Sequence, residues 1–518
     1  MISKMNTNTS QRNLRRLVIM TMVSCFMLIS FELSAWDCIE THPTINALAF
    51  EHFVARFNAG HFKDRFKGMQ IDNQAQFSGL TFSKAVKYEA STEAKTINTV
   101  GVFSQWLERG GHDADVPQVR MGFRHFYDPV YEPRYLTWLR RKIIKPDKNK
   151  FSNEKELFES YNYRADDWNP NIEFGTVNRK IRLQPKIFRP EIDAITWGMS
   201  HEENEHNWQN GKLAYKAAME NDTSTFGSLN RSQMFGKAFR ALGETMHLMA
   251  DMTQPAHTRA DSHSLYEPIE GSVNAKMVRK VIGDAHKDPN FRPVPEFDIE
   301  PGLSPEELMK SVAAFTNSHF FSNDSVFDFE KWIFPRSNKR PYPSPQLSKL
   351  RHEAGIYYSY FETVGWVPLA KETGSRFSKV FNDNDKYGRK NPKFNVMPYF
   401  AEKQAQVLIP LAIYNCAELI GAFLPRLSIS SSLRKISGNS YELSGSLLHH
   451  ADDPEWQDIG EIRYNGEGYI KVNSQWLRCN FIDGQLKPVK LELAPGDIVK
   501  LSVRNGAVIV QGEAITAD

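Results

Sequence analysis

The chain is poor in cysteine. Its 518 residues include four cysteines, one of which, Cys25, lies in an apolar N-terminal stretch. The other three, Cys38, Cys416 and Cys479, are too few and too widely spaced for a disulfide-stapled fold or a cysteine zinc finger. An odd number leaves at least one thiol outside any bridge within the chain. A bridge between Cys38 and Cys416 stays open, because we expect both to lie in one helical region.

The chain also lacks an excess of charge of one sign. The formal net charge is +3, and the four basic residues and Glu32 of the first 35 residues account for it. The rest of the chain is therefore close to neutral, which argues against a nucleic-acid partner held by bulk charge. The sequence has no Gly-x-Ser-x-Gly string and no internal repeat, and the segment from residue 427 holds no dense aspartate cluster for calcium.

Long hydrophobic runs are scarce, and the clearest one stands at the N-terminus. Four basic residues precede an apolar run from Leu17 to Phe31, and the small residues Ser34 and Ala35 follow it. This order is typical of a secretory signal peptide, and the run is shorter than the roughly 20 residues that a membrane span needs. We therefore expect residues 1–35 to be removed, so that the mature protein begins at Trp36 and is secreted or periplasmic.

Histidine and carboxylate residues gather between His247 and Glu267. His247 and Asp251 are four residues apart, and so are His263 and Glu267, with His257 between the two pairs. Residues at this spacing lie on one face of a helix. Three imidazoles and two carboxylates suit zinc. A polar loop with hydrogen-bonded histidines is the alternative, and the repeated spacing argues against it.

More candidate ligands lie upstream. Asp115 ends the string Gly110-Gly-His-Asp-Ala-Asp, and His125 opens His-Phe-Tyr-Asp-Pro. His42 follows Trp36 in Trp-Asp-Cys-Ile-Glu-Thr-His. This combination resembles the zinc-dependent phospholipase C family, whose helical trinuclear zinc fold is shared with zinc nucleases specific for single strands. The motifs come in the family's order, and the nuclease branch usually carries Asp where Glu267 stands here.

The resemblance implies three zinc ions per chain. The first would be held by Asp115, His125, His247 and Asp251. The second would be held by His257, His263 and Glu267. The third would be held by His42, by the amine and carbonyl of Trp36, and by Asp251 as a bridge to the first.

The same resemblance implies hydrolysis of a phosphodiester by attack of a zinc-bound water on phosphorus. Asp115 is the candidate catalytic residue, as a general base. Asp113 is its rival on the same turn, and we prefer Asp115 because the family's aspartate comes five residues after the turn glycine, here Gly110. His52 has no counterpart in the family, so we expect a packed or solvated side chain.

The periodicity of the chain predicts a mainly α protein with a different tail. Helices are expected from Thr41-His42-Pro43, over residues 232–251 and near residues 397–424. We assign residues 36–426 to a multi-helix, phospholipase C-like catalytic domain with insertions near 130–230 and 270–395. From residue 427, alternating apolar and polar residues predict a small β-sandwich or barrel over 427–518.

The sequence thus predicts a zinc phosphodiesterase that acts on phospholipid or another phosphodiester, with membrane-surface contact and no stable nucleic-acid partner. A single-strand nuclease or 3′-nucleotidase on the same fold is one alternative. A secreted binding protein with structural metals is another, and the nine ligand positions argue against it because a structural zinc closes with four protein ligands. The sequence does not indicate an oligomeric state.

Overall fold

The structure is a computed structural model of the chain, and part of the chain is described here. The described residues are 39–83, 95–116, 121, 124–129, 192–259, 268–297, 302–322, 345–372, 394–450 and 452–518. The predicted leader lies outside these ranges, as do Trp36, Cys38, His263 and Glu267. Cys416 is buried, and its thiol donates to the carbonyl of Met246 at 3.2 Å.

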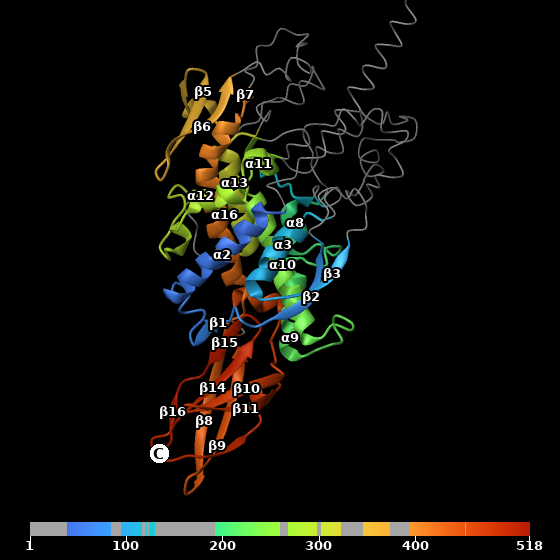
Figure 1. Cartoon of the computed structure of the whole chain (residues 1–518), viewed down its shortest axis with the longest axis vertical. Helices are drawn as coiled ribbons and strands as arrows, with labels where there is room; N and C mark the ends of the chain where they lie inside the picture. The colour runs from blue at the N-terminus through green and yellow to red at the C-terminus, as the bar shows by residue number, and fades with distance from the viewer. Residues whose placement is uncertain are drawn as a thin grey trace, which may run out of the picture.

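Helices form the middle of the molecule (Figure 1). The α-helices are α2 (Thr41–Asn58), α3 (Phe103–Asp113), α8 (Ala194–Met199), α9 (Trp208–Glu220), α10 (Arg231–Asp251), α11 (Pro268–Ser272), α12 (Ala275–Ile282), α13 (Pro305–His319) and α16 (Pro398–Phe423). Short 3₁₀ helices are η3 (His257–Arg259), η4 (Ala285–Lys287), η5 (Leu347–Lys349) and η6 (Pro454–Ile459). The three helices expected from periodicity are confirmed as α2, α10 and α16, each within two residues at either end.

Helix α10 is the central element, packed against α2, α3, α9 and α16. Its start is capped by Asn230, whose side chain accepts from the backbone N–H of Gln233 at 3.0 Å. Two glycines let α3 cross it closely, since a Cβ on Gly243 would lie 2.5 Å from the Leu107 carbonyl and one on Gly110 2.3 Å from the Arg240 carbonyl. This backbone contact brings the end of α3 beside the last turns of α10.

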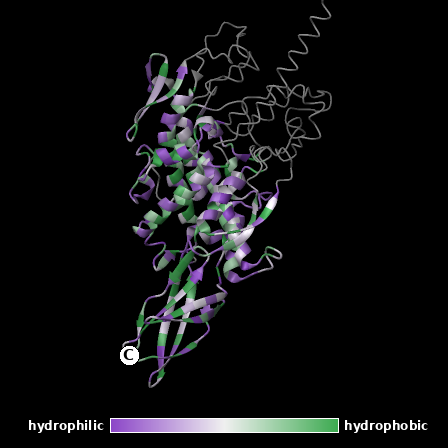
Figure 2. Ribbon diagram, viewed as in Figure 1, coloured by the Kyte–Doolittle hydropathy of each residue, from purple (hydrophilic) through white to green (hydrophobic). Residues whose placement is uncertain are grey.

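Helix α16 is long and apolar enough to cross a membrane by length and composition alone. Within the molecule, however, 78% of its most apolar window is buried. Figure 2 shows hydrophobic residues along the helices of the middle and along strands of the lower sheet. The burial identifies α16 as a core helix of this fold.

Strands are more numerous than the sequence indicated. They are β1 (Met69–Ile71), β2 (Phe77–Phe82), β3 (Thr96–Gly101), β4 (Arg351–Glu353), β5 (Ile356–Phe361), β6 (Gly365–Glu372), β7 (Phe394–Asn395), β8 (Leu427–Ser437), β9 (Ser440–His449), β10 (Gly466–Val472), β11 (Gln475–Ile482), β12 (Gln485–Leu486), β13 (Val489–Glu492), β14 (Ile498–Asn505), β15 (Val508–Gln511) and β16 (Ile515–Thr516). β2 pairs with β3, and β4 to β7 form a four-stranded sheet at one end of the molecule (Figure 1).

The ten remaining strands form one antiparallel sheet, in the order β1-β15-β14-β10-β11-β12-β9-β13, with β16 on β14 and β8 on β9. The prediction of a mainly α protein with a small β-sandwich or barrel is therefore wrong. The sheet forms a half-barrel, and its edge strand β1 comes from the N-terminal part of the chain, where Met69 pairs with Val510. A three-residue strand carries no periodicity of its own, because its partner is more than 400 residues away in the sequence.

The sheet is joined to the helices through buried contacts. Tyr215 of α9 donates its hydroxyl hydrogen to the carbonyl of Asn505 at 3.4 Å and packs edge-on against Trp456. Gly506 lies so close to Phe235 of α10 that a Cβ there would be 2.6 Å from the ring. Arg65 pairs with Asp453 at 2.7 Å. The tail thus covers one end of the helical core.

Deletion of residues 428–518 is expected to destabilise the helical region and not merely to remove an appendage. It would uncover Tyr215 and Phe235, whose exposure costs about 3 to 6 kcal/mol together. A thermal melt of the truncated and full-length chains checks this. A truncated chain that melts at the full-length temperature would contradict it.

Candidate metal centre

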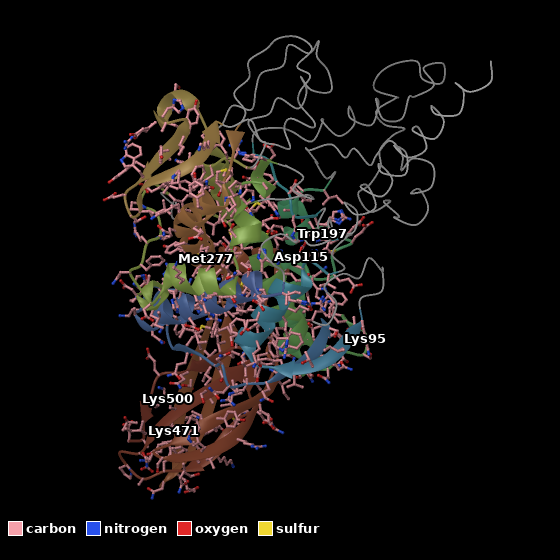
Figure 3. All side chains as sticks on the ribbon, turned by 45° about the horizontal axis from the view of Figure 1, so that its top comes forward. Lys95, Asp115, Trp197, Met277, Lys471 and Lys500 are labelled. Atoms are coloured by element: carbon pink, nitrogen blue, oxygen red, sulfur yellow. The ribbon has the colours of Figure 1, made fainter. Side chains whose placement is uncertain are left out.

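Six of the nine predicted metal ligands lie among the described residues, and all six meet in one buried cluster. They are His42, Asp115, His125, His247, Asp251 and His257. Each of these residues is at most 2% exposed. The other three, Trp36, His263 and Glu267, lie outside the described residues. Figure 3 places Asp115 in the helical part of the molecule, away from the sheet that carries Lys471 and Lys500.

Five segments bring these side chains together, and His125 lies on one of them, the stretch 124–129. His42 stands in the first turn of α2, and its ring stacks on that of His247 with centroids 3.5 Å apart. Asp115 follows the end of α3, and His247 and Asp251 occupy the last two turns of α10, on one face as their spacing predicts. His257 begins η3, where the ring of Phe126 stacks on it.

Asp115, His125, His247 and Asp251 are spaced as ligands of one ion. The Nδ1 atom of His125 lies 3.3 Å from Asp115 Oδ1, 2.8 Å from Asp251 Oδ2 and 3.2 Å from His247 Nε2. His247 Nε2 lies 3.6 Å from Asp115 Oδ2 and 3.4 Å from Asp251 Oδ2. Metal bonds of about 2.0–2.1 Å in a tetrahedron place ligand atoms about 3.3 Å apart. These residues therefore fit a tetrahedral ion.

Backbone carbonyls fix which nitrogen of each ring faces the cluster. A carbonyl oxygen only accepts, so His247 Nδ1 donates to Gly111 at 2.7 Å, and His257 Nδ1 donates to His125 at 2.8 Å. His125 Nε2 lies 3.4 Å from the Ala114 carbonyl. The second nitrogen of each ring is left with a lone pair, which is the arrangement of a metal-bound histidine whose other N–H is hydrogen-bonded.

Burial sets the charge of the cluster. It lowers the pKa of His42 and His247 well below the usual value, and it also lowers the pKa of His125 and His257. Neutral imidazole is the form that binds a metal. Burial also raises the pKa of Asp251 to about 7. Among the described residues, no donor makes a well-directed hydrogen bond to either oxygen of Asp251.

Metal affinity is expected to fall as the pH drops below about 7. The folded metal-free protein holds a proton on Asp251 below that pH, because its pKa is raised, and an ion must displace this proton. The imidazoles contribute little, since their lowered pKa values keep them neutral. Chelator competition between about pH 5.5 and 8 should show close to a tenfold loss of affinity per pH unit, as for one proton. A pH-independent affinity would contradict the assignment.

The structure separates Asp115 from its rival Asp113. Asp113 accepts from the hydroxyl of Thr81 at 2.6 Å and pairs with Arg240 at 3.2 Å and with His112 at 2.8 Å. Its carboxylate is thus neutralised in a separate buried network. Asp115, as preferred from its spacing to Gly110, is the aspartate that faces His125 and His247.

A narrow pocket, too tight to hold a water molecule, adjoins the cluster at His125. Its wall includes Trp197 of α8, Glu244 of α10 and His206, none of which the sequence had singled out. Burial raises the pKa of Glu244 to about 7, although Arg240 donates to it at 2.8 Å. Trp197 and His206 lie in the insertion near 130–230, where no motif marks them. In the sequence, only the position of Glu244, one helical turn before the candidate ligand His247, could have indicated that it lies near the cluster.

His52 is packed inside the protein and takes no part in the cluster. It is buried, and its Nδ1 donates to the carbonyl of His286 at 2.8 Å. Burial lowers its pKa to about 4. Of the two states expected for this residue, packed and solvated, the structure shows the packed one.

No protein-family model matches this chain, and a search among curated proteins finds no match. The buried histidine and aspartate groups therefore carry the functional argument. They can hold a metal ion, and they form three overlapping groups in which His125, His247 and Asp251 each belong to two.

Proposed function

We propose that the protein is a secreted zinc-dependent phosphodiesterase of the phospholipase C type. The observation that carries this proposal is the sharing of ligands among three buried groups. A structural zinc site closes with four protein ligands. Six buried candidate ligands in three groups, two of which contain Asp251, suit a centre with more than one ion. Buried imidazole and carboxylate together favour zinc over magnesium or calcium.

The proposed zinc ligands follow from the geometry and the family resemblance. Asp115, His125, His247 and Asp251 would hold one ion, and Asp251 Oδ1, 3.5 Å from His42 Nε2, would reach a second that Trp36 completes. His257 would contribute to a third, with His263 and Glu267. Zinc ions at such a site neutralise charge that builds on a phosphodiester and make a bound water more acidic.

The protein's own residues orient and shield the reacting groups. Asp115 directs one oxygen towards His125 and the other towards His247, so its carboxylate is held at the centre as the candidate general base. The apolar side chains of Trp197 and Leu248 line the adjoining pocket. Backbone acceptors hold the imidazoles in their ligand tautomers, which avoids reorganisation when substrate binds.

Product analysis of the mature protein tests the function. The zinc-loaded chain beginning at Trp36 should release diacylglycerol and a phosphorylated head group from mixed phospholipid vesicles, and Asp251→Asn provides the background. Cleavage of single-stranded DNA without diacylglycerol would instead identify a nuclease. A zinc-loaded protein that cleaves neither would point to a binding protein.

A further inference from the structure

Helix α11 places a further acidic side chain, that of Glu270, against the metal centre. Glu270 is 5% exposed, and its Oε1 lies 3.2 Å from Nε2 of His257. The sequence motifs do not include this residue, which follows Glu267 by three positions.

The contact needs a cation between the two atoms. His257 Nδ1 donates to the carbonyl of His125, so in the neutral ring Nε2 carries a lone pair. A lone pair that faces a carboxylate oxygen at 3.2 Å is repulsive in a buried site unless a proton or a metal ion lies between them. The separation also matches the edge of about 3.3 Å expected between two ligands of one tetrahedral zinc.

An ion between His257 and Glu270 would lie at a different position from the ion held by Asp115, His125, His247 and Asp251. Asp251 Oδ1 lies 3.4 Å from the Nδ1 side of His257, whereas Glu270 meets the Nε2 side of the same ring. An ion bound to Nε2 therefore stands beyond the ring from Asp251. Glu270 identifies the place where the ion assigned to His257 would bind.

We propose that Glu270 is a ligand of the metal ion that His257 binds, in addition to the ligands that the family resemblance implies. This inference rests on the proposed metal centre. In this arrangement α11 supplies the negative charge of the Glu270 carboxylate to the ion, for which His257 is the other described ligand.

Glu270→Gln tests this inference, because glutamine keeps an oxygen that can accept from an imidazole N–H but loses the charge of a metal ligand. Zinc content is measured by elemental analysis, and the affinity of the weakest ion by competition with a chromophoric chelator. We expect Glu270→Gln to lose about one zinc per chain or to bind it at least about tenfold more weakly, with the other ions unchanged. Glu270→His, which restores a ligand atom, should recover part of that loss.

Glu51→Gln is the matched control. Glu51 accepts from His286 Nε2 at 2.9 Å, so it is also a glutamate paired with a histidine, but it lies outside the cluster. Its zinc content and affinity should equal those of the wild type. If Glu270→Gln fails to fold, Glu270→Ala takes its place: loss of one zinc or at least about tenfold weaker binding supports the ligand, and unchanged zinc affinity overturns it.

Unchanged zinc affinity in folded Glu270→Gln would overturn the proposal, since it would show that only a proton joins the pair. A wild-type protein without zinc would overturn it together with the proposed function. A wild-type protein that binds zinc but hydrolyses no phosphodiester would overturn the proposed function alone, and loss of an ion in Glu270→Gln would still support the ligand.

Discussion

Asp251→Asn is expected to reduce phosphodiesterase activity by at least about a hundredfold and to lower the zinc content. The carboxylate lies 2.8 Å from His125, 3.4 Å from His247, 3.4 Å from His257 and 3.5 Å from His42. The neutral amide has one oxygen instead of two, so it cannot bridge two ions. Elemental analysis and turnover of the purified variant measure both effects.

The matched control for Asp251→Asn is His52→Ala. His52 is a buried histidine on α2, like His42, but its bond to the His286 carbonyl lies outside the cluster. Its removal should leave turnover per folded molecule nearly unchanged and cost about 1 to 3 kcal/mol of stability, because a buried carbonyl loses its donor. An inactive His52→Ala beside an active Asp251→Asn would refute the ligand assignment.

Removal of zinc by a chelator is expected to abolish activity and to lower the melting temperature by about 10 °C. Metal that binds only the folded chain contributes about 4 kcal/mol when its free concentration is a thousand times the dissociation constant. Losing about 4 kcal/mol of stability corresponds to lowering the melting temperature by about 10 °C. The shift is large because α2, α3 and α10 each supply or position ligands, so the ions connect segments far apart in the sequence.

Restoring zinc should recover both activity and melting temperature, whereas calcium should recover neither. Calcium prefers oxygen ligands, and the cluster is rich in imidazole. A chelated protein that has lost its zinc but melts at the original temperature would show that the metals do not join these helices.

The helical part of the fold was largely predictable because its signals are local. A proline near the first turn indicated α2, and the apolar spacing of residues 232–251 indicated α10. The prediction of the strands failed because their signals are not local. β1 has three residues and exists as a strand through its pairing with β15, and the strands of residues 351–372 lie in a region that was regarded as an insertion. Pairing partners that distant leave no pattern in the segment itself.

The candidate site shows the same division. Spacing placed His247 and Asp251 on one helix face, and the distance from Gly110 favoured Asp115 over Asp113. The sequence could not reveal that Asp113 accepts a hydrogen bond from Thr81 and pairs with Arg240, since these partners come from β2 and α10. Trp197 and Glu270 were also hidden from the sequence analysis, because neither belongs to a motif and only the fold brings them beside His125 and His257.

The sequence by itself supplied the candidate ligands and their order along the chain. Helical spacing placed His247 and Asp251 on one face, and the resemblance to the zinc-dependent phospholipases C implied the others. Only the tertiary structure decided which of these atoms meet. The crossing of α3 and α10 at Gly110 and Gly243 brings Asp115 towards His247. Backbone carbonyls turn the free nitrogen of His247 towards Asp251 and that of His257 towards Glu270. These contacts depend on close packing between segments that are distant in the sequence. The loss of conformational entropy and the gain from packing both arise only when the whole core is assembled.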